Sequence, residues 1–147
     1  MTCIALYQAR TGIDPSANAE ALVAAVAEAA SGGAAMLFTP EMSGLLDRDR
    51  ERASAHLHVE AEDPVLAAVR TAAARTGIWV HLGSLAIRGD TGGKLRNRGY
   101  LITGSGEVRT CYDKLHLFDV DLATGESWRE SASYAPGERA VVADTPA

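Results

Sequence analysis

The sequence predicts an α/β fold with a mixed β-sheet and helices, chiefly from the order of its apolar segments. In the first half, short apolar runs alternate with longer stretches whose apolar residues recur at helical spacing. In the second half, apolar segments follow one another across short glycine turns, which is typical of antiparallel hairpins. Strand–helix alternation favours parallel pairing and hairpins favour antiparallel pairing, so both kinds are expected in one sheet.

The first half is predicted to contain two strand–helix units and a further strand region. Each helix has a start signal, because an Asp-Pro pair supplies a capping side chain and a proline suited to the first helical position. Glycine follows each helix as a stop signal. The expected segments are a buried strand at 3–8, a helix at 15–31, a buried strand at 35–38, a helix from 64 to about 77, and a strand, or a strand interrupted by a bulge, over 78–82 and 84–87. The stretch at 42–63 is polar and irregular.

The second half is predicted to begin with a hairpin and to continue as a long loop. A turn at 89–93 precedes it, and the hairpin strands at 99–103 and 108–112 flank a Gly-Ser-Gly turn. A polar loop follows over 119–136, and one more short strand is expected at 140–143. With no internal repeat and no linker, residues 1–147 form one predicted domain. A sheet that ends on such a strand leaves an unpaired edge.

Composition and charge exclude several classes of protein. The chain has 147 residues and a formal net charge of -5, without a basic stripe, which disfavours nucleic-acid binding. No apolar stretch is long enough to span a membrane, and the first residues lack the features of a signal peptide. Two cysteines do not make a disulfide framework, so a cytoplasmic, reducing location is expected.

Lys114 is the first residue that points to chemistry. It follows Val108, Thr110 and Tyr112 at a spacing of two, so it is predicted to share their face of a strand. An ammonium placed there near a reacting carbonyl can stabilise a developing oxyanion. Taken alone, a strand-end lysine that extends into water is the more ordinary interpretation.

Two glutamates are candidate partners of that lysine. Glu41 directly follows a predicted buried strand and Pro40, and the ends of such strands are where α/β sheets gather their sites. A carboxylate held against apolar walls is suited to act as a general base. Glu130 lies in the predicted loop before Pro136 and could hold Lys114 in place. Each glutamate, taken alone, is more often an exposed loop residue.

The surroundings of these three residues resemble the nitrilase superfamily of carbon–nitrogen hydrolases. The resemblance covers essentially the whole chain, in order and spacing, and is greatest to the amidase-like Nit branch, which includes ω-amidase and deaminated glutathione amidase. The segments that carry it are 38–42, 97–100, 104–108, 112–121, 125–131 and 134–137.

The resemblance implies the N-terminal half of a four-layer αββα sandwich and a Cys–Glu–Lys site. Glu41 would be the general base, Lys114 would stabilise the tetrahedral intermediate, and Glu130 would support them. The implied reaction splits a small linear amide into acid and ammonia through a cysteine thioester. Neither a metal nor an organic cofactor is implied, and a homo-oligomer is expected.

The nucleophile is the missing part of this prediction. The family's cysteine opens a helix after the next strand, and the sequence ends at Ala147 before such a segment. Cys111 is an odd number of residues from Lys114, which predicts the opposite face of the strand. Cys3 is predicted to be a small buried residue at the far end of the first strand. The chain alone is therefore expected to be inactive, and the alternative is a non-catalytic half-domain that serves binding or assembly.

The remaining motifs are weak. His56 and His58 lack a third ligand at a sensible spacing for a metal, and His81 is predicted to lie in the core or in a pocket wall. His116 belongs to the Lys114 motif and is expected to shape its loop. The glycine-rich segment 89–94 resembles a phosphate-binding loop but fails the required spacing.

Overall fold

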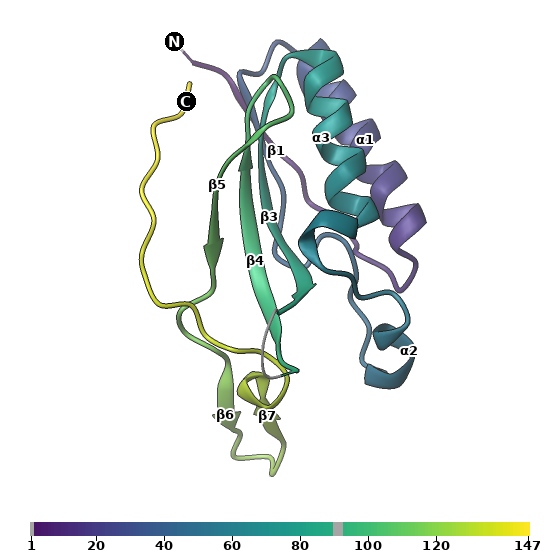
Figure 1. The fold of residues 1–147 in the computed structure, drawn as a ribbon, viewed down its shortest axis with the longest axis vertical. Helices are drawn as coiled ribbons and strands as arrows, with labels where there is room; N and C mark the ends of the chain where they lie inside the picture. Colours follow the sequence, from purple (N-terminus) through teal and green to yellow (C-terminus); the bar gives the residue numbers. More distant parts are fainter. Residues whose placement is uncertain (1, 90–92) are drawn as a thin grey trace.

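The computed structural model describes residues 2–89 and 93–147 and shows a five-stranded mixed sheet with helices on one face (Figure 1). Along the sheet the order is β1, β2, β3, β4, β5, the same as along the chain. The strands β1 to β3 pair in parallel, and β3 to β5 pair antiparallel. Their bounds are Ile4–Leu6, Met36–Phe38, Trp79–Arg88, Leu95–Ile102 and Val108–Asp113. The predicted fold class is confirmed.

Two helices, α1 (Pro15–Ser31) and α3 (Pro64–Thr76), lie side by side against the sheet (Figure 1). Both begin as predicted, because Asp14 accepts a hydrogen bond from the Ser16 backbone N–H and Asp63 accepts one from that of Leu66. The main hydrophobic core lies between these helices and the sheet. Its most deeply buried aliphatic side chains are Val26, Val69, Val80, Leu82 and Ile102.

The segment predicted as irregular contains short helices. Helix α2 (Arg50–Ser54) is capped by Asp49, which accepts a hydrogen bond from the Arg52 N–H, and a 3-10 turn covers Glu60–Glu62. These elements carry no buried residues. Helix α2 has the Asp49 cap, whereas the 3-10 turn has no side-chain cap and its Glu60 accepts a hydrogen bond from Arg98. Neither element depends on apolar burial, so the hydrophobic pattern of the sequence could not predict them.

The predicted loop at 119–136 was wrong in part, because it contains a second sheet. Strands β6 (Asp119–Asp121) and β7 (Ser127–Arg129) pair antiparallel, and a 3-10 turn at Glu130–Ala132 follows them. An ion pair between Arg129 and Asp121, with nitrogen and oxygen 2.7 Å apart, joins the two strands. This hairpin is held mainly by polar contacts, so it shows little of the apolar alternation that marks a strand.

Two further strand predictions need correction. The segment at 140–143 is extended but pairs with no strand in the described part of the chain, and it runs past β5 (Figure 1). Strand β1 exists but is not buried, because its Ile4 and Leu6 pair with Met36 and Phe38 on the sheet face that the helices do not cover. Ile4 is 47% exposed and Leu6 is 74% exposed, and Cys3, predicted to be buried, is also exposed.

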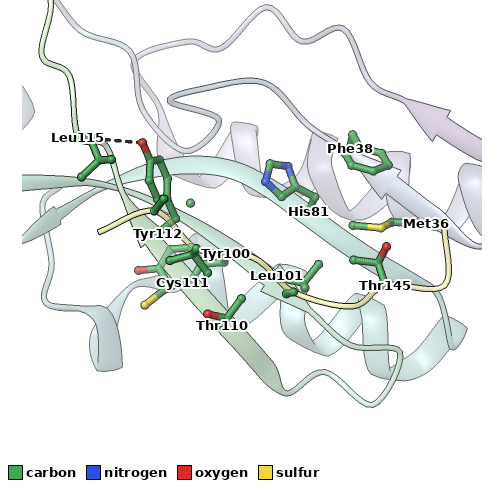
Figure 2. Close-up of a pocket in the computed structure, with 14 residues that line it drawn as sticks. Met36, Phe38, His81, Tyr100, Leu101, Thr110, Cys111, Tyr112, Leu115 and Thr145 are labelled. Atoms are coloured by element: carbon green, nitrogen blue, oxygen red, sulfur yellow. Dashed lines mark hydrogen bonds between the residues drawn. The ribbon is translucent and has the colours of Figure 1, made fainter. Parts of the chain in front are cut away.

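The sheet face opposite the helices is open in this structure. Pairing places Met36, Phe38, His81, Leu101 and Thr110 on this face, because directly paired residues point to the same side. A cavity of about 430 Å³ lies there, between the strands and the segment at 140–145 (Figure 2). Within the described residues, no helix has the length and apolar character needed to cross a membrane.

Candidate active site

Glu41 lies in a tight turn that follows β2 and is tied to β3. The Met42 N–H donates to the Ser84 hydroxyl at 2.9 Å, and the Ser43 N–H donates to the Ser84 carbonyl at 2.9 Å. Met42 has a φ of 54°, in the left-handed region that non-glycine residues rarely adopt. The turn therefore has a defined shape, and it directs Glu41 toward β4.

A bulge in β3 makes this attachment possible. Leu82 pairs with Tyr100 and Leu85 pairs with Arg98, so two residues of β3 lie opposite one residue of β4. One of them, Gly83, approaches the chain after β2 so closely that a Cβ would lie 2.3 Å from the Thr39 carbonyl oxygen. Only glycine fits there, so the bulge brings the Glu41 turn against the centre of the sheet.

Lys114 directly follows β5 and is held by backbone hydrogen bonds on both sides. Its N–H donates to the Asn97 carbonyl at 2.9 Å, and its own carbonyl accepts from the Gly137 N–H at 2.9 Å. The predicted face is right for Thr110 and Tyr112 but wrong for Val108. A bulge at residue 109 pairs Val108 with Ile102 on the helix side, and Thr110 with Leu101 on the open side.

Glu130 opens the 3-10 turn after β7, and its side chain turns back toward the Lys114 loop. The Phe118 N–H donates to Glu130 Oε2 at 2.7 Å, while the Glu130 N–H donates to the Phe118 carbonyl at 3.2 Å. This reciprocal pair fixes the position of the carboxylate. The β6–β7 hairpin, which sequence analysis missed, therefore delivers the third site residue.

The structure brings the three predicted residues together. Lys114 Nζ lies 2.9 Å from Glu41 Oε1 and 2.9 Å from Glu130 Oε2. The Lys114 side chain is 28% exposed, that of Glu130 is 15% exposed, and that of Glu41 is 56% exposed. The site is thus partly desolvated around Lys114 and Glu130 and opens to solvent beside Glu41.

The charges of this cluster support one another. Burial acts to lower the pKa of Lys114, but hydrogen bonds from its ammonium to Glu41 and Glu130, and their charges, outweigh burial and raise that pKa. Burial acts to raise the pKa of Glu130, but hydrogen bonds from the Phe118 backbone, Lys114 and Asn97 outweigh it and lower that pKa. Lys114 is therefore a cation and Glu130 an anion at neutral pH.

Two polar neighbours were not predicted as site residues. Asn97, in β4, is 4% exposed, and its Nδ2 lies 2.7 Å from Glu41 Oε1 and 3.2 Å from Glu130 Oε1. Tyr134 follows Glu130, and burial together with the charges of Glu130 and Glu41 raises the pKa of its phenol to about 12. Asn97 stands between Arg96 and Arg98, before the strand predicted at 99–103, so no apolar alternation marked it. Tyr134 was marked only by its place in the segment 134–137, one of those that carry the family resemblance.

An ion cluster on the other face fixes the strand ends that carry the site. Arg98 donates to Asp113 through Nε at 2.6 Å and Nη2 at 2.9 Å, and to Glu60 through Nη1 at 2.6 Å. Arg98 follows Asn97, and Asp113 precedes Lys114. A two-pronged guanidinium–carboxylate contact restricts both strands, so it holds Asn97 and Lys114 in register.

Neither cysteine joins this cluster. Cys111 pairs with Tyr100 and packs against the helix-side core, on the face opposite Lys114, as alternation predicts. In Figure 2 the Cys111 sulfur and the Tyr112 ring leave β5 in opposite directions. The Cys3 carbonyl accepts from the Ala35 N–H, at the end of the β1–β2 pair remote from Glu41.

The weaker candidates stay outside the site. Among the described residues, no group of three or more His, Cys, Asp or Glu side chains is arranged to hold a metal, so His56 and His58 form no such centre. His81 lines the open-face cavity beside Phe38, with ring centres 5.5 Å apart, in a pocket wall as expected. His116 is exposed in the loop after Lys114. Residues 90–92 of the glycine-rich segment lie outside the described residues.

Comparison with known proteins places this geometry in a family. The carbon-nitrogen hydrolase family matches residues 3–147. Over 78% of its length, the chain is 34% identical to a deaminated glutathione amidase from Yersinia enterocolitica, of which the match covers 40%. It is 28% identical to a chloroplastic omega-amidase from Arabidopsis thaliana, over 97% of this chain and 39% of the relative.

The solved structures agree with the sequence relatives. An amidase from Nesterenkonia sp. AN1 superposes with a TM-score of 0.75 at 28% identity, covering 95% of this chain and 51% of that one. The chain thus spans about half the length, or less, of these proteins. The match of the family over nearly the whole sequence shows that this chain belongs to the carbon–nitrogen hydrolases.

Proposed function

We propose that this chain supplies the acid–base and oxyanion-stabilising residues of an amidase-type site for small linear amides. The observation that carries the proposal is the position of Lys114 Nζ, 2.9 Å from both Glu41 and Glu130. A charged, partly desolvated ammonium between two carboxylates suits a reaction that forms an oxyanion and moves protons. Relatives named as amidases support amide hydrolysis as that reaction.

In the proposed reaction Glu41 moves the protons. Its carboxylate takes the proton of a cysteine thiol, and the thiolate attacks the amide carbon to give a tetrahedral oxyanion. Glu41 returns the proton to the departing nitrogen, so ammonia leaves and a thioester remains. Glu41 then takes a proton from water, which attacks the thioester and releases the acid and the thiol.

Lys114 and Glu130 divide the remaining work. An ammonium has three N–H donors. In this structure Lys114 donates to Glu41 and Glu130, which leaves a third N–H for the oxyanion. Glu130 keeps Lys114 charged and fixed in direction, and takes no proton itself. No metal or organic cofactor enters the scheme.

The nucleophile of the scheme is neither Cys3 nor Cys111. One solved form of the Nesterenkonia amidase carries acrylamide added to its active-site cysteine, so that relative has such a thiol. We infer that residues 1–147 are the Glu/Lys/Glu part of a longer catalytic unit, and that the chain alone does not turn over amides.

The first test is ammonia release from simple amides by the 147-residue chain, for which we expect no turnover. The second joins the chain to the cysteine-bearing remainder of the Nesterenkonia amidase, for which we expect release that Glu41→Gln or Lys114→Met abolishes. Turnover by the chain alone would contradict the inferred need for another thiol. A folded chimera whose activity is absent, or indifferent to Glu41→Gln, would reject amide hydrolysis.

The second candidate is a non-catalytic module for binding or assembly. The open sheet face favours it, because its cavity is lined largely by apolar side chains and β1 is exposed beside it. A homo-oligomer and a cytoplasmic location remain proposals under both candidates. A chain that associates tightly and whose chimera is inactive would support the module.

A further inference from the structure

We propose that Asn97 is a positioning residue that joins Glu41 and Glu130 through the two N–H groups of its carboxamide. Its catalytic meaning rests on the proposed amidase function, whereas its structural role does not. The sequence comparisons assign no role to Asn97. The proposal rests on the burial of this β4 side chain, on its hydrogen bonds and on the charges around it.

The hydrogen bonds of Asn97 connect the two carboxylates directly. Nδ2 donates to Glu41 Oε1 at 2.7 Å and to Glu130 Oε1 at 3.2 Å. A carboxylate can only accept, so the amide nitrogen must face both glutamates, and its two hydrogens serve one each. With Lys114 on the other side, the four side chains close a ring of alternating donors and acceptors.

Charge explains why a neutral donor suits this position. Glu41 and Glu130 carry two negative charges and Lys114 carries one positive charge, so one ammonium cannot neutralise the cluster. The described structure shows no second cation bonded to either carboxylate. An amide group brings two donors and no net charge. It therefore stabilises both anions without adding a second positive charge, which would disfavour the charged form of Lys114.

The setting of Asn97 makes its direction well defined. The residue is 4% exposed, pairs with Ala86 in β3, and accepts the Lys114 backbone N–H on its own carbonyl at 2.9 Å. Buried polar groups are costly unless they are hydrogen-bonded, and the side chain has only a short reach. The carboxylates of Glu41 and Glu130 must therefore both lie within hydrogen-bonding distance of the Asn97 amide, which fixes the distance between the two carboxylates.

The contacts also differ between the two oxygens of Glu41. The side-chain hydrogen bonds found for Glu41 in the described residues, from Asn97 and Lys114, both end on Oε1. The Glu41 side chain is 56% exposed, and Oε2 accepts no hydrogen bond from the described residues, so Oε2 is the oxygen left to take and return a proton. Asn97 thus sets which oxygen faces the reacting groups.

The test uses NMR of the 147-residue chain and requires no turnover. In the wild-type chain, the Asn97 side-chain NH₂ signals should exchange slowly and should shift as the pH falls from about 7 to about 3 and Glu130 begins to take up a proton. In Asn97→Leu the pKa of Glu130 should rise by about 1, because a hydrogen bond to the anion is lost. In Asn97→Asp it should rise further, because a third carboxylate is added.

Asn18 provides a matched control. It is the only other asparagine in the chain, is 9% exposed, and bonds to the Gly12 and Gly44 backbone instead of the site carboxylates. Asn18→Leu should lower the stability but leave the Glu130 pKa unchanged. A purely structural role for Asn97 would make the two leucine variants alike in both measurements.

Two results would overturn the proposal. One is a folded Asn97→Leu or Asn97→Asp variant in which the Glu130 pKa does not move. The other is a wild-type Asn97 side-chain amide whose hydrogens exchange as fast as those of an exposed amide and whose NMR signals do not shift with pH. This result decides the question even if both variants fail to fold. In the active chimera, Asn97→Leu should lower kcat about 10- to 100-fold with little change in KM.

These results separate this proposal from the proposed function. If the chimera releases no ammonia while the Glu130 pKa responds to Asn97, amide hydrolysis is rejected and the positioning role stands. If ammonia is released and the pKa is unmoved, the positioning role is rejected and the function stands.

Discussion

Lys114 owes its charge to its two carboxylate partners. Partial burial disfavours an ammonium, but the carboxylates of Glu41 and Glu130 outweigh that cost and raise the Lys114 pKa. Its contribution to stability is therefore present below the ordinary lysine pKa and is lost as the pH rises through the higher folded value. The same residue holds the glutamates together, so its removal leaves two like charges facing each other.

Lys114→Met is expected to destabilise the chain by about 1–2 kcal/mol at pH 7, a range reduced for partial solvent exposure. The cost should shrink at about pH 3, below the ordinary glutamate pKa of about 4.3, because protonation of Glu130 begins to remove one of the two facing charges. Urea unfolding at both pH values measures this. Lys94→Met is the control, because Lys94 is exposed and its ammonium bonds only to the Ser131 carbonyl among the described residues. Equal costs for the two variants would contradict the prediction.

Glu130 has the opposite pH dependence. Burial raises its pKa, but the hydrogen bonds it accepts from Phe118, Lys114 and Asn97 lower that pKa overall. A lowered carboxyl pKa stabilises the fold above its ordinary value of about 4.3, and that stability disappears as the pH falls through the folded value. The window of interest therefore lies at and below about pH 4.3.

Glu130→Gln should flatten the dependence of the unfolding free energy on pH in that window. Chemical denaturation at closely spaced pH values provides the curve. Glu126→Gln is a matched control, because Glu126 is an exposed carboxylate of the same hairpin. If both variants follow the wild-type curve, Glu130 is not held as an anion by its neighbours.

At the scale of elements, the β3 bulge decides where the site forms. Gly83 allows β3 to touch the turn after β2, and hydrogen bonds from Met42 and Ser43 to Ser84 attach that turn. Glu41 is therefore positioned by β3 more than by β2, which precedes it in sequence. The two hydrogen bonds from Arg98 to Asp113 link β4 and β5 in a comparable way on the helix side.

Gly83→Ala is expected to cost about 1–3 kcal/mol of stability, the usual cost of overpacking a tight interior. It should also separate Glu41 from Lys114, because the Cβ would clash with the Thr39 carbonyl. Thermal unfolding and the Glu130 pKa report on these two effects. Gly32→Ala is the control, since Gly32 has a φ of -76° and an added Cβ would meet only ordinary contacts. Similar losses in the two variants would contradict the prediction.

At the scale of the whole molecule, helices cover one face of the sheet and leave the other partly open. The C-terminal segment covers part of that face, over the cavity of about 430 Å³. Beside it, β1 is an edge strand with exposed Ile4 and Leu6. An unpaired edge with exposed apolar side chains is prone to association.

The chain is therefore expected to self-associate in a concentration-dependent manner, as sedimentation velocity would show. Leu6→Lys should weaken the association, because a charged edge residue opposes strand pairing. Val142→Lys is the control, since Val142 is 98% exposed and contributes little contact area. A sharp monomer at every concentration would remove the basis for this prediction.

The predictions from the sequence were most accurate where local signals were strong. Asp-Pro starts and glycine stops located α1 and α3, and the hairpin pattern located β5 and the second half of β4, which begins at Leu95 and not at the predicted residue 99. They were wrong where a segment depends on remote partners. The β6–β7 hairpin is held by polar contacts, β1 lies at an uncovered edge, and the segment at 140–143 finds no strand to pair with in the described part of the chain.

By itself, the sequence determined the α/β class and the family, and it named Glu41, Lys114 and Glu130 as candidate site residues. Capping, periodicity and motif order depend on residues that are neighbours in sequence, so they can be recognised from the sequence alone. Only the tertiary structure decided that these residues meet, and that Asn97 joins the two carboxylates. Hydrogen bonds across 56 and 33 residues of chain create that contact, and their geometry depends on the bulge, the register and the hairpin together.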